Sequence, residues 1–77
     1  MKILLLKKLE KVLQDFFKNK ELKIKNNTKI KDIKKWDSLN HIKIIVILEK
    51  KFNIKFSGDQ IYNVKNINDI LKNINKK

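Results

Sequence analysis

Three stretches of this 77-residue chain repeat apolar residues at steps of three and four positions, the spacing of a helix with one buried face. They cover positions 5–17, 37–52 and 66–74, and polar segments separate them. The chain has no proline and one glycine, Gly58, so it contains few residues that interrupt a helix. This pattern predicts an all-α fold with three main helices.

The first predicted helix is followed by a segment, 19–37, that has no sustained period. Asn26-Asn27 indicates a turn within it. Apolar residues still recur there at wide intervals, which favours a long first loop pinned to a core over a free linker: Leu22, Ile24, Ile30, Ile33 and Trp36.

The middle segment begins at Asp37-Ser38, and either residue is a suitable N-cap. Its run of β-branched residues at 44–47 suits a strand, but about 15 residues without glycine or proline exceed a usual strand length and favour a helix. On a helical wheel the apolar residues form two stripes. One stripe, for the core, is Ile44, Ile45, Leu48 and Phe52; the other, left for a partner or ligand, is Leu39, Ile42 and Val46.

Two further caps follow in the C-terminal part. Ser57 with Gln60 has the form of a capping box and predicts a short helix that carries Ile61. Asn66 is the predicted cap of the last helix, with Asp69 in its first turn. We therefore expect a single domain over 1–77, a small four-helix bundle of three main helices, one short helix and a long first loop.

Composition excludes several classes of protein. Without cysteine there is no disulfide framework and no thiolate metal site, and the one histidine, His41, cannot build a metal cluster. A chain of this length argues against an enzyme with a deep pocket. The apolar run at 3–6 is too short for a signal peptide, and no run is long enough to span a membrane, so we expect a cytoplasmic protein without a membrane partner.

The net charge of +12 leaves a small basic helical nucleic-acid-binding protein as the alternative function. All 20 basic residues are lysine, whereas nucleic-acid readers favour arginine, whose planar fork matches guanine edges and phosphates. The lysines are also scattered along the whole chain, among many Asn and Ile. Codon bias of an A/T-rich genome is a second explanation of the charge.

Asp37-Ser38-Leu39, followed by a long helix, a connector, a short helix and an amphipathic last helix, resembles the acyl carrier protein family. The resemblance covers nearly the whole chain and is strongest from Trp36 to Phe56. It implies that Ser38, by itself an ordinary capping residue, carries a 4′-phosphopantetheine arm. The arm would be attached by a phosphopantetheinyl transferase that uses Mg²⁺, which Asp37 would help to organise.

The resemblance also implies that the chain is not an enzyme but carries acyl or aminoacyl groups as thioesters, in fatty-acid or secondary-metabolite biosynthesis. Its partners would be the transferase and the enzymes that load and transfer these groups, with Leu39, Ile42 and Val46 as the docking face. A core stripe is the other reading of these three. We expect a monomer that binds neither nucleic acid nor a resident metal. A carrier-like domain that is never modified is a third possibility, which the intact Asp37-Ser38-Leu39 disfavours.

Several remaining residues have plain structural interpretations. We expect His41 to pack or cap and Trp36 to anchor the loop. Glu49 has no lysine one turn ahead, since that position is Asn53, and is predicted to be a solvated acid near the docking face.

Two features depart from the family. Lys34, Lys35 and Trp36 stand where a glycine is common, and the middle helix lacks the usual acids. We therefore expect partners whose docking faces are less basic than usual, or acidic.

Overall fold

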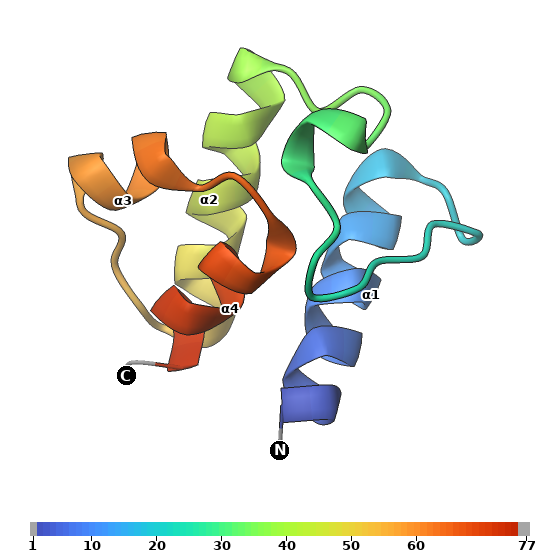
Figure 1. Cartoon of the computed structure of the whole chain (residues 1–77), viewed down its shortest axis with the longest axis horizontal. Helices are drawn as coiled ribbons and strands as arrows, with labels where there is room; N and C mark the ends of the chain where they lie inside the picture. The colour runs from blue at the N-terminus through green and yellow to red at the C-terminus, as the bar shows by residue number, and fades with distance from the viewer. Residues whose placement is uncertain (1, 76–77) are drawn as a thin grey trace.

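The chain folds into a helical bundle without extended strands over residues 2–75, the part that a computed structural model describes, with side chains from Leu4 onward. The helices are α1 (Lys2–Phe17), α2 (Ser38–Phe52), the short α3 (Gly58–Asn63) and α4 (Ile67–Asn75). Figure 1 shows α1 on one side of the molecule and α2 and α4 on the other, with α3 at the outer edge. The predicted all-α class, with its long first loop, is confirmed; a 3-10 turn in that loop, η1 (Ile30–Asp32), was not predicted.

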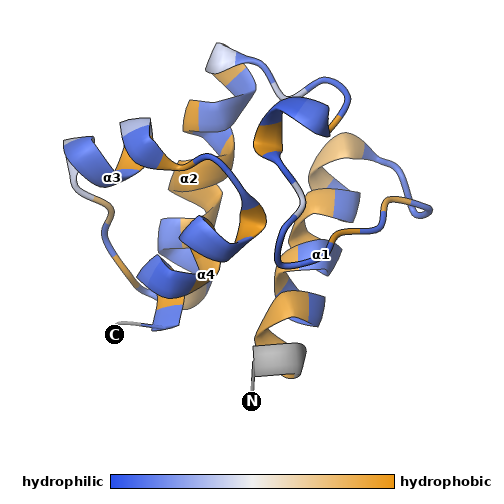
Figure 2. Cartoon of the chain, in the orientation of Figure 1, coloured by the Kyte–Doolittle hydropathy of each residue, from blue (hydrophilic) through white to orange (hydrophobic). Residues whose placement is uncertain are grey.

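Aliphatic side chains from α1, α2 and α4 form the core. Figure 2 shows apolar faces of these helices turned toward one another. Each fully buried side chain of this size contributes about 1.5–3 kcal/mol relative to its exposed state. The largest fully buried side chains are Leu9, Leu13, Ile44, Ile45, Leu48, Ile67 and Ile70. The predicted core stripe of α2 is therefore buried as expected, with Phe52 partly buried at its end.

The long loop is held against the beginning of α4 by backbone hydrogen bonds. Ile30 N donates to Lys65 O at 2.9 Å, and Ile67 N donates to Thr28 O at 2.9 Å. The apolar anchors of the loop point into the core, where Ile24, Ile30 and Ile33 are buried. The predicted loop is thus pinned at both backbone and side-chain level.

Polar side chains of α1 bind the other end of the same loop. Glu10 Oε2 accepts a hydrogen bond from Ile24 N at 2.9 Å, and Gln14 Nε2 donates to Leu22 O at 2.8 Å. Both bonds satisfy backbone groups that have no helix or strand to pair with. The sequence pattern did not identify either contact.

The prediction for Glu49 was wrong. Its side chain is partly buried, and Oε2 accepts a hydrogen bond from Phe56 N at 2.9 Å, in the connector between α2 and α3. Asn53, with a left-handed φ of 54°, ends α2 and turns the chain back along the helix, which brings Phe56 within reach. Glu49 is therefore a structural acceptor rather than a free surface charge.

The two predicted caps of the C-terminal helices are confirmed. Ser57 and Gln60 form a reciprocal capping box at α3. Asn66 Oδ1 accepts from Asp69 N at 2.9 Å at the beginning of α4. Asp69 Oδ2 accepts in return from Lys65 N and Asn66 N, at 2.9 and 3.3 Å, so Asp69 also fixes the entry into this helix.

We predict that Glu49→Ala lowers the free energy of unfolding by about 1–3 kcal/mol, because the N–H of the buried Phe56 loses its acceptor. Urea unfolding followed by circular dichroism measures the change. Asp15→Ala is the matched control, since the Lys11–Asp15 pair lies on the surface and its loss should change stability by about 0.5 kcal/mol or less. Equal effects of the two substitutions would contradict the structural role of Glu49.

Candidate functional site

Asp37, rather than Ser38, caps α2. Its backbone is extended, and its Oδ1 accepts a hydrogen bond from Asn40 N at 2.8 Å. Ser38 is the first residue of the helix and is exposed to solvent. The sequence left the cap open between these two residues, and the structure assigns it to the aspartate. The serine hydroxyl is consequently not needed to cap the first turn of the helix.

Lys35 turns the chain into α2 with a left-handed backbone, φ 69°. Its carbonyl accepts hydrogen bonds from Asp37 N at 3.1 Å and from Asn40 Nδ2 at 2.8 Å. Glycine adopts the left-handed backbone conformation without steric cost, because it has no Cβ. The stretch in which the family often has glycine therefore keeps a glycine-like backbone here, occupied by a lysine.

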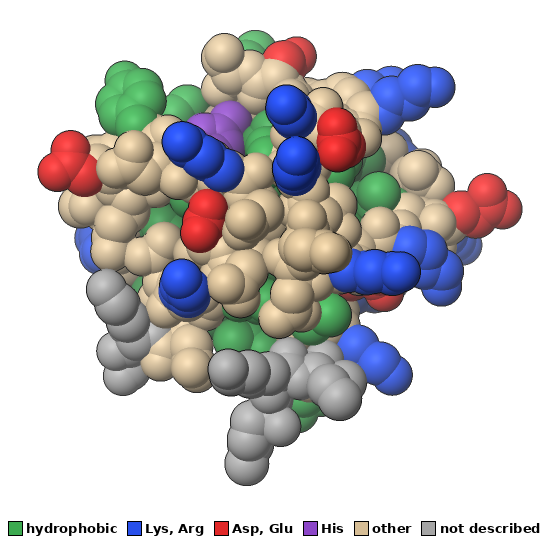
Figure 3. Space-filling model, viewed as in Figure 1, with side chains coloured by type: hydrophobic (Ala, Val, Ile, Leu, Met, Phe, Trp, Pro, Cys, Tyr) green, Lys and Arg blue, Asp and Glu red, His purple; other side chains and the backbone are tan. Residues whose placement is uncertain are grey.

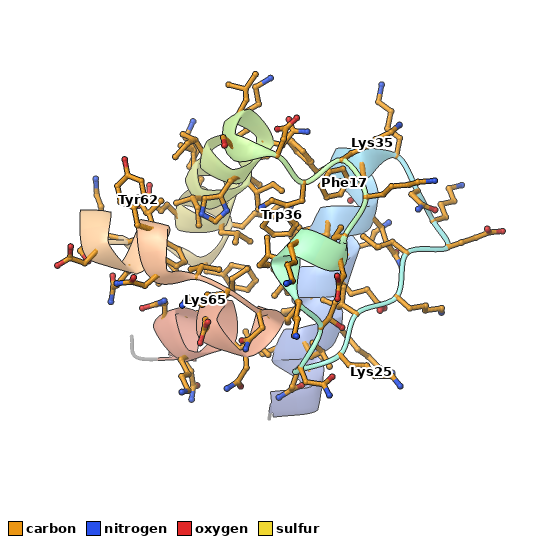
Figure 4. The ribbon with its side chains drawn as sticks, turned by 45° about the horizontal axis from the view of Figure 1, so that its top comes forward. Phe17, Lys25, Lys35, Trp36, Tyr62 and Lys65 are labelled. Carbon is orange, nitrogen blue, oxygen red and sulfur yellow. The ribbon has the colours of Figure 1, made fainter. Side chains whose placement is uncertain are left out.

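Trp36 and His41 link the loop, α2 and α3. Trp36 Nε1 donates to His41 Nδ1 at 2.9 Å, and His41 Nε2 lies 2.8 Å from Ile61 O. Because an indole N–H can only donate, Nδ1 is the acceptor and the proton is on Nε2, which donates to Ile61. Figure 4 shows Trp36 in the interior near Phe17, whose ring centroid is 6.1 Å away. Trp36 thus anchors the loop as predicted, and His41 packs between the loop and α3, in agreement with the packing or capping role predicted for it.

A groove of about 860 Å³ opens beside Ser38, between the loop, α2 and α3. Its apolar lining includes Trp36, Ile42, Ile61 and Val64. In Figure 3 the imidazole of the single histidine lies in a recess on this side of the molecule, with lysine side chains in front of it. Three lysines line the groove as well, Lys29, Lys31 and Lys65.

The second apolar stripe of α2 lies exposed next to this groove. The exposed fractions are 65% for Leu39, 49% for Ile42 and 44% for Val46. On α3, Tyr62 is 87% exposed, and Figure 4 shows it extending away from the bundle. The helical wheel thus separated the buried and exposed stripes correctly. Among the described residues there is no group of acids and histidine that could hold a metal ion.

None of the described helices is long and apolar enough to cross a membrane. The second helix of the bundle begins with an exposed serine beside a groove. A family model described as "phosphopantetheine attachment site" matches residues 7–74. No curated protein sequence matches the chain.

The structure is also similar to the solution NMR structure of a holo acyl carrier protein from Geobacter metallireducens. The TM-score is 0.85 at 32% sequence identity, and the match covers 94% of this chain and 83% of that one. The chain belongs to the acyl carrier protein family, and its function is that of an acyl carrier with covalently attached 4′-phosphopantetheine. Neither comparison supports the nucleic-acid-binding alternative.

We predict that Lys35→Gly raises the free energy of unfolding by about 0.5–1 kcal/mol. The left-handed backbone costs a residue with a Cβ roughly 1–2 kcal/mol, and the greater flexibility of glycine in the unfolded chain offsets part of the gain. Lys34→Gly is the control: Lys34 does not have a positive φ and should lose about 0.5–1 kcal/mol. Urea unfolding distinguishes the two, and a loss of stability in Lys35→Gly would contradict the prediction.

Proposed function

We propose that Ser38 is the residue that carries the phosphopantetheine arm. The observation that supports this most directly is its position: Ser38 opens α2, is exposed, and is released from capping by Asp37. A transferase needs an accessible hydroxyl, and the N-terminal N–H groups and dipole of a long helix favour a phosphate anion nearby. The groove beside Ser38 adds an apolar surface next to the point of attachment.

In this proposal the Ser38 hydroxyl is the nucleophile of the loading reaction. Its Oγ forms a bond to the phosphorus that bears the pantetheine of coenzyme A, the pyrophosphate bond breaks, and adenosine bisphosphate leaves. The transferase takes the hydroxyl proton and supplies Mg²⁺. Asp37 uses Oδ1 for the cap, and we propose that its carboxylate also helps to position that Mg²⁺.

The arm supplies a thiol on which acyl or aminoacyl groups are carried as thioesters. The chain has no cysteine of its own, so without the arm it lacks a thiol nucleophile. We infer that the protein catalyses no step itself and serves enzymes that load and transfer these groups in the cytoplasm, where coenzyme A is available. The family match over residues 7–74 supports a single carrier domain.

The exposed stripe of α2 is the proposed docking face for those enzymes, defined as Leu39, Ile42 and Val46. It begins directly after Ser38, and all three side chains expose more than two fifths of their surface. Exposed apolar groups beside a reactive position are typical of a protein interaction site. An enzyme seated on this stripe would reach the serine or its arm.

We predict that the chain gains one phosphopantetheine when incubated with coenzyme A, Mg²⁺ and a permissive phosphopantetheinyl transferase. Intact-mass spectrometry detects the gain. Ser38→Ala should abolish it, because the attacking hydroxyl is gone. The matched control is Ser57→Ala, which removes the second of the two serines and weakens only the α3 cap. Loading of Ser38→Ala, or no loading of the wild-type chain, would refute the assignment.

We predict that Leu39→Ala lowers kcat/KM for loading about fivefold, which corresponds to about 1 kcal/mol of lost docking energy. The free energy of unfolding should remain nearly unchanged, because Leu39 is mostly exposed. Leu4→Ala is the control, since Leu4 is an exposed leucine on α1. If both substitutions leave kcat/KM unchanged, the stripe is not the docking face.

A further inference from the structure

We propose that the docking face of α2 is built for enzymes whose own docking surfaces are acidic. The inference rests on the proposed function, because it takes Leu39, Ile42 and Val46 as the docking face. It concerns the charges around that stripe.

Two exposed lysines flank the docking face along α2. Lys43 follows Leu39 by four residues and Lys50 follows Val46 by four, so each lies one turn further along the same side of the helix. With about 100° between successive residues, both lysines lie within roughly 60° of Leu39 and Val46 on the wheel. A partner that covers the stripe therefore meets two ammonium groups at its edge.

The two acids at the ends of α2 already accept hydrogen bonds from backbone N–H groups. Glu49 accepts a hydrogen bond from Phe56 N, and Asp37 accepts one from Asn40 N. Within α2 itself three lysines stand against this one glutamate, a formal charge of +2. On α3 the acid is Asp59, in the first turn. A basic residue of a partner that approached Glu49 would thus compete with the Phe56 N–H for its carboxylate.

The positive charge continues to the attachment serine. Lys29, Lys31 and Lys65 line the groove that also includes Ser38 and Ile42, and all three are exposed. Charges within a Debye length of about 10 Å at 0.1 M salt act together on an approaching protein. Their summed field attracts an acidic surface and slows the association of a basic one.

An enzyme fits this surface better than a nucleic acid does. Exposed apolar side chains lie between the lysines of α2 and those of the groove: Leu39, Ile42, Val46 and the neighbouring Tyr62. An apolar centre with a charged rim is the arrangement of a protein–protein interface. A nucleic acid would leave the apolar centre without a partner.

The test compares two transferases on two carriers. One transferase has a basic carrier-binding surface; the other is the same enzyme with those basic residues changed to glutamate. The carriers are the wild-type chain and Lys43→Glu/Lys50→Glu. We expect the basic transferase to load the double variant with a kcat/KM about tenfold above that of the wild-type chain, and the acidic one to show the opposite ratio. Both ratios should approach one as the salt concentration rises.

Lys23→Glu/Lys51→Glu is the matched control. It has the same change in net charge, but Lys23 lies in the long loop and Lys51 on another side of α2, and both are exposed. The proposal is overturned if this control shifts the ratios as much, or if the basic transferase loads the wild-type chain as well as or better than the double variant. Sedimentation with phosphatidylserine vesicles or duplex DNA that depends on Lys43 and Lys50 would also overturn it.

Failure of the attachment proposal gives a different result. The end point of loading reports Ser38 irrespective of rate. Suppose that every carrier except Ser38→Ala is loaded completely, and that the ratio of kcat/KM between double variant and wild-type chain is the same for both transferases. This result would refute the acidic-partner proposal alone. If no carrier is loaded at all, the attachment proposal is refuted.

Discussion

Hydrogen bonds from backbone N–H groups to carboxylates hold the connections of this fold to its helices. Four of the eight acidic residues have this role: Glu10, Asp37, Glu49 and Asp69. Hydrogen bonds to charged groups contribute about 1.5–3 kcal/mol each, which is considerable for a domain of this size. They determine where the long loop, the start of α2, the α2–α3 connector and the entry to α4 lie, and so the position of Ser38.

This use of acids has a consequence for the surface. A chain with 20 lysines and 8 acids, four of which already accept hydrogen bonds from its own backbone, presents mostly lysine to its partners. The net charge that first suggested nucleic acid is then better understood as the property of a carrier whose α2 departs from the acidic type. Net charge alone does not identify the class of partner. The exposed apolar groups and the accessible serine on the same surface favour an enzyme over a nucleic acid.

Much of the fold could be predicted because the helices and their caps depend on residues close together in the sequence. Periods of three and four residues indicated the helices, and the two stripes of α2 separated buried Ile44 and Leu48 from exposed Leu39. The caps at Ser57 and Asn66 followed from spacing within one turn. The resemblance around Asp37-Ser38-Leu39 indicated the family, and the comparisons confirm it.

The errors and omissions concern contacts between segments far apart in sequence or backbone conformations that side-chain identity disfavours. Glu49 seemed free because its partner is a backbone N–H seven residues away, which no side-chain pattern encodes. The Trp36–His41–Ile61 link likewise needs α3 to be in place. Lys35 adopts a left-handed backbone that a lysine does not signal.

By itself, the sequence determined the helices, their buried faces and the residue type offered at the start of α2, because these depend on neighbours within one or two turns. Tertiary structure alone decided that Glu10 accepts from Ile24 N in the loop, that Trp36 and His41 link the loop to α3, and that a groove opens beside Ser38. These outcomes depend on the packing of the helices against the loop and against one another, and only packing brings donors and acceptors from distant segments within bonding distance.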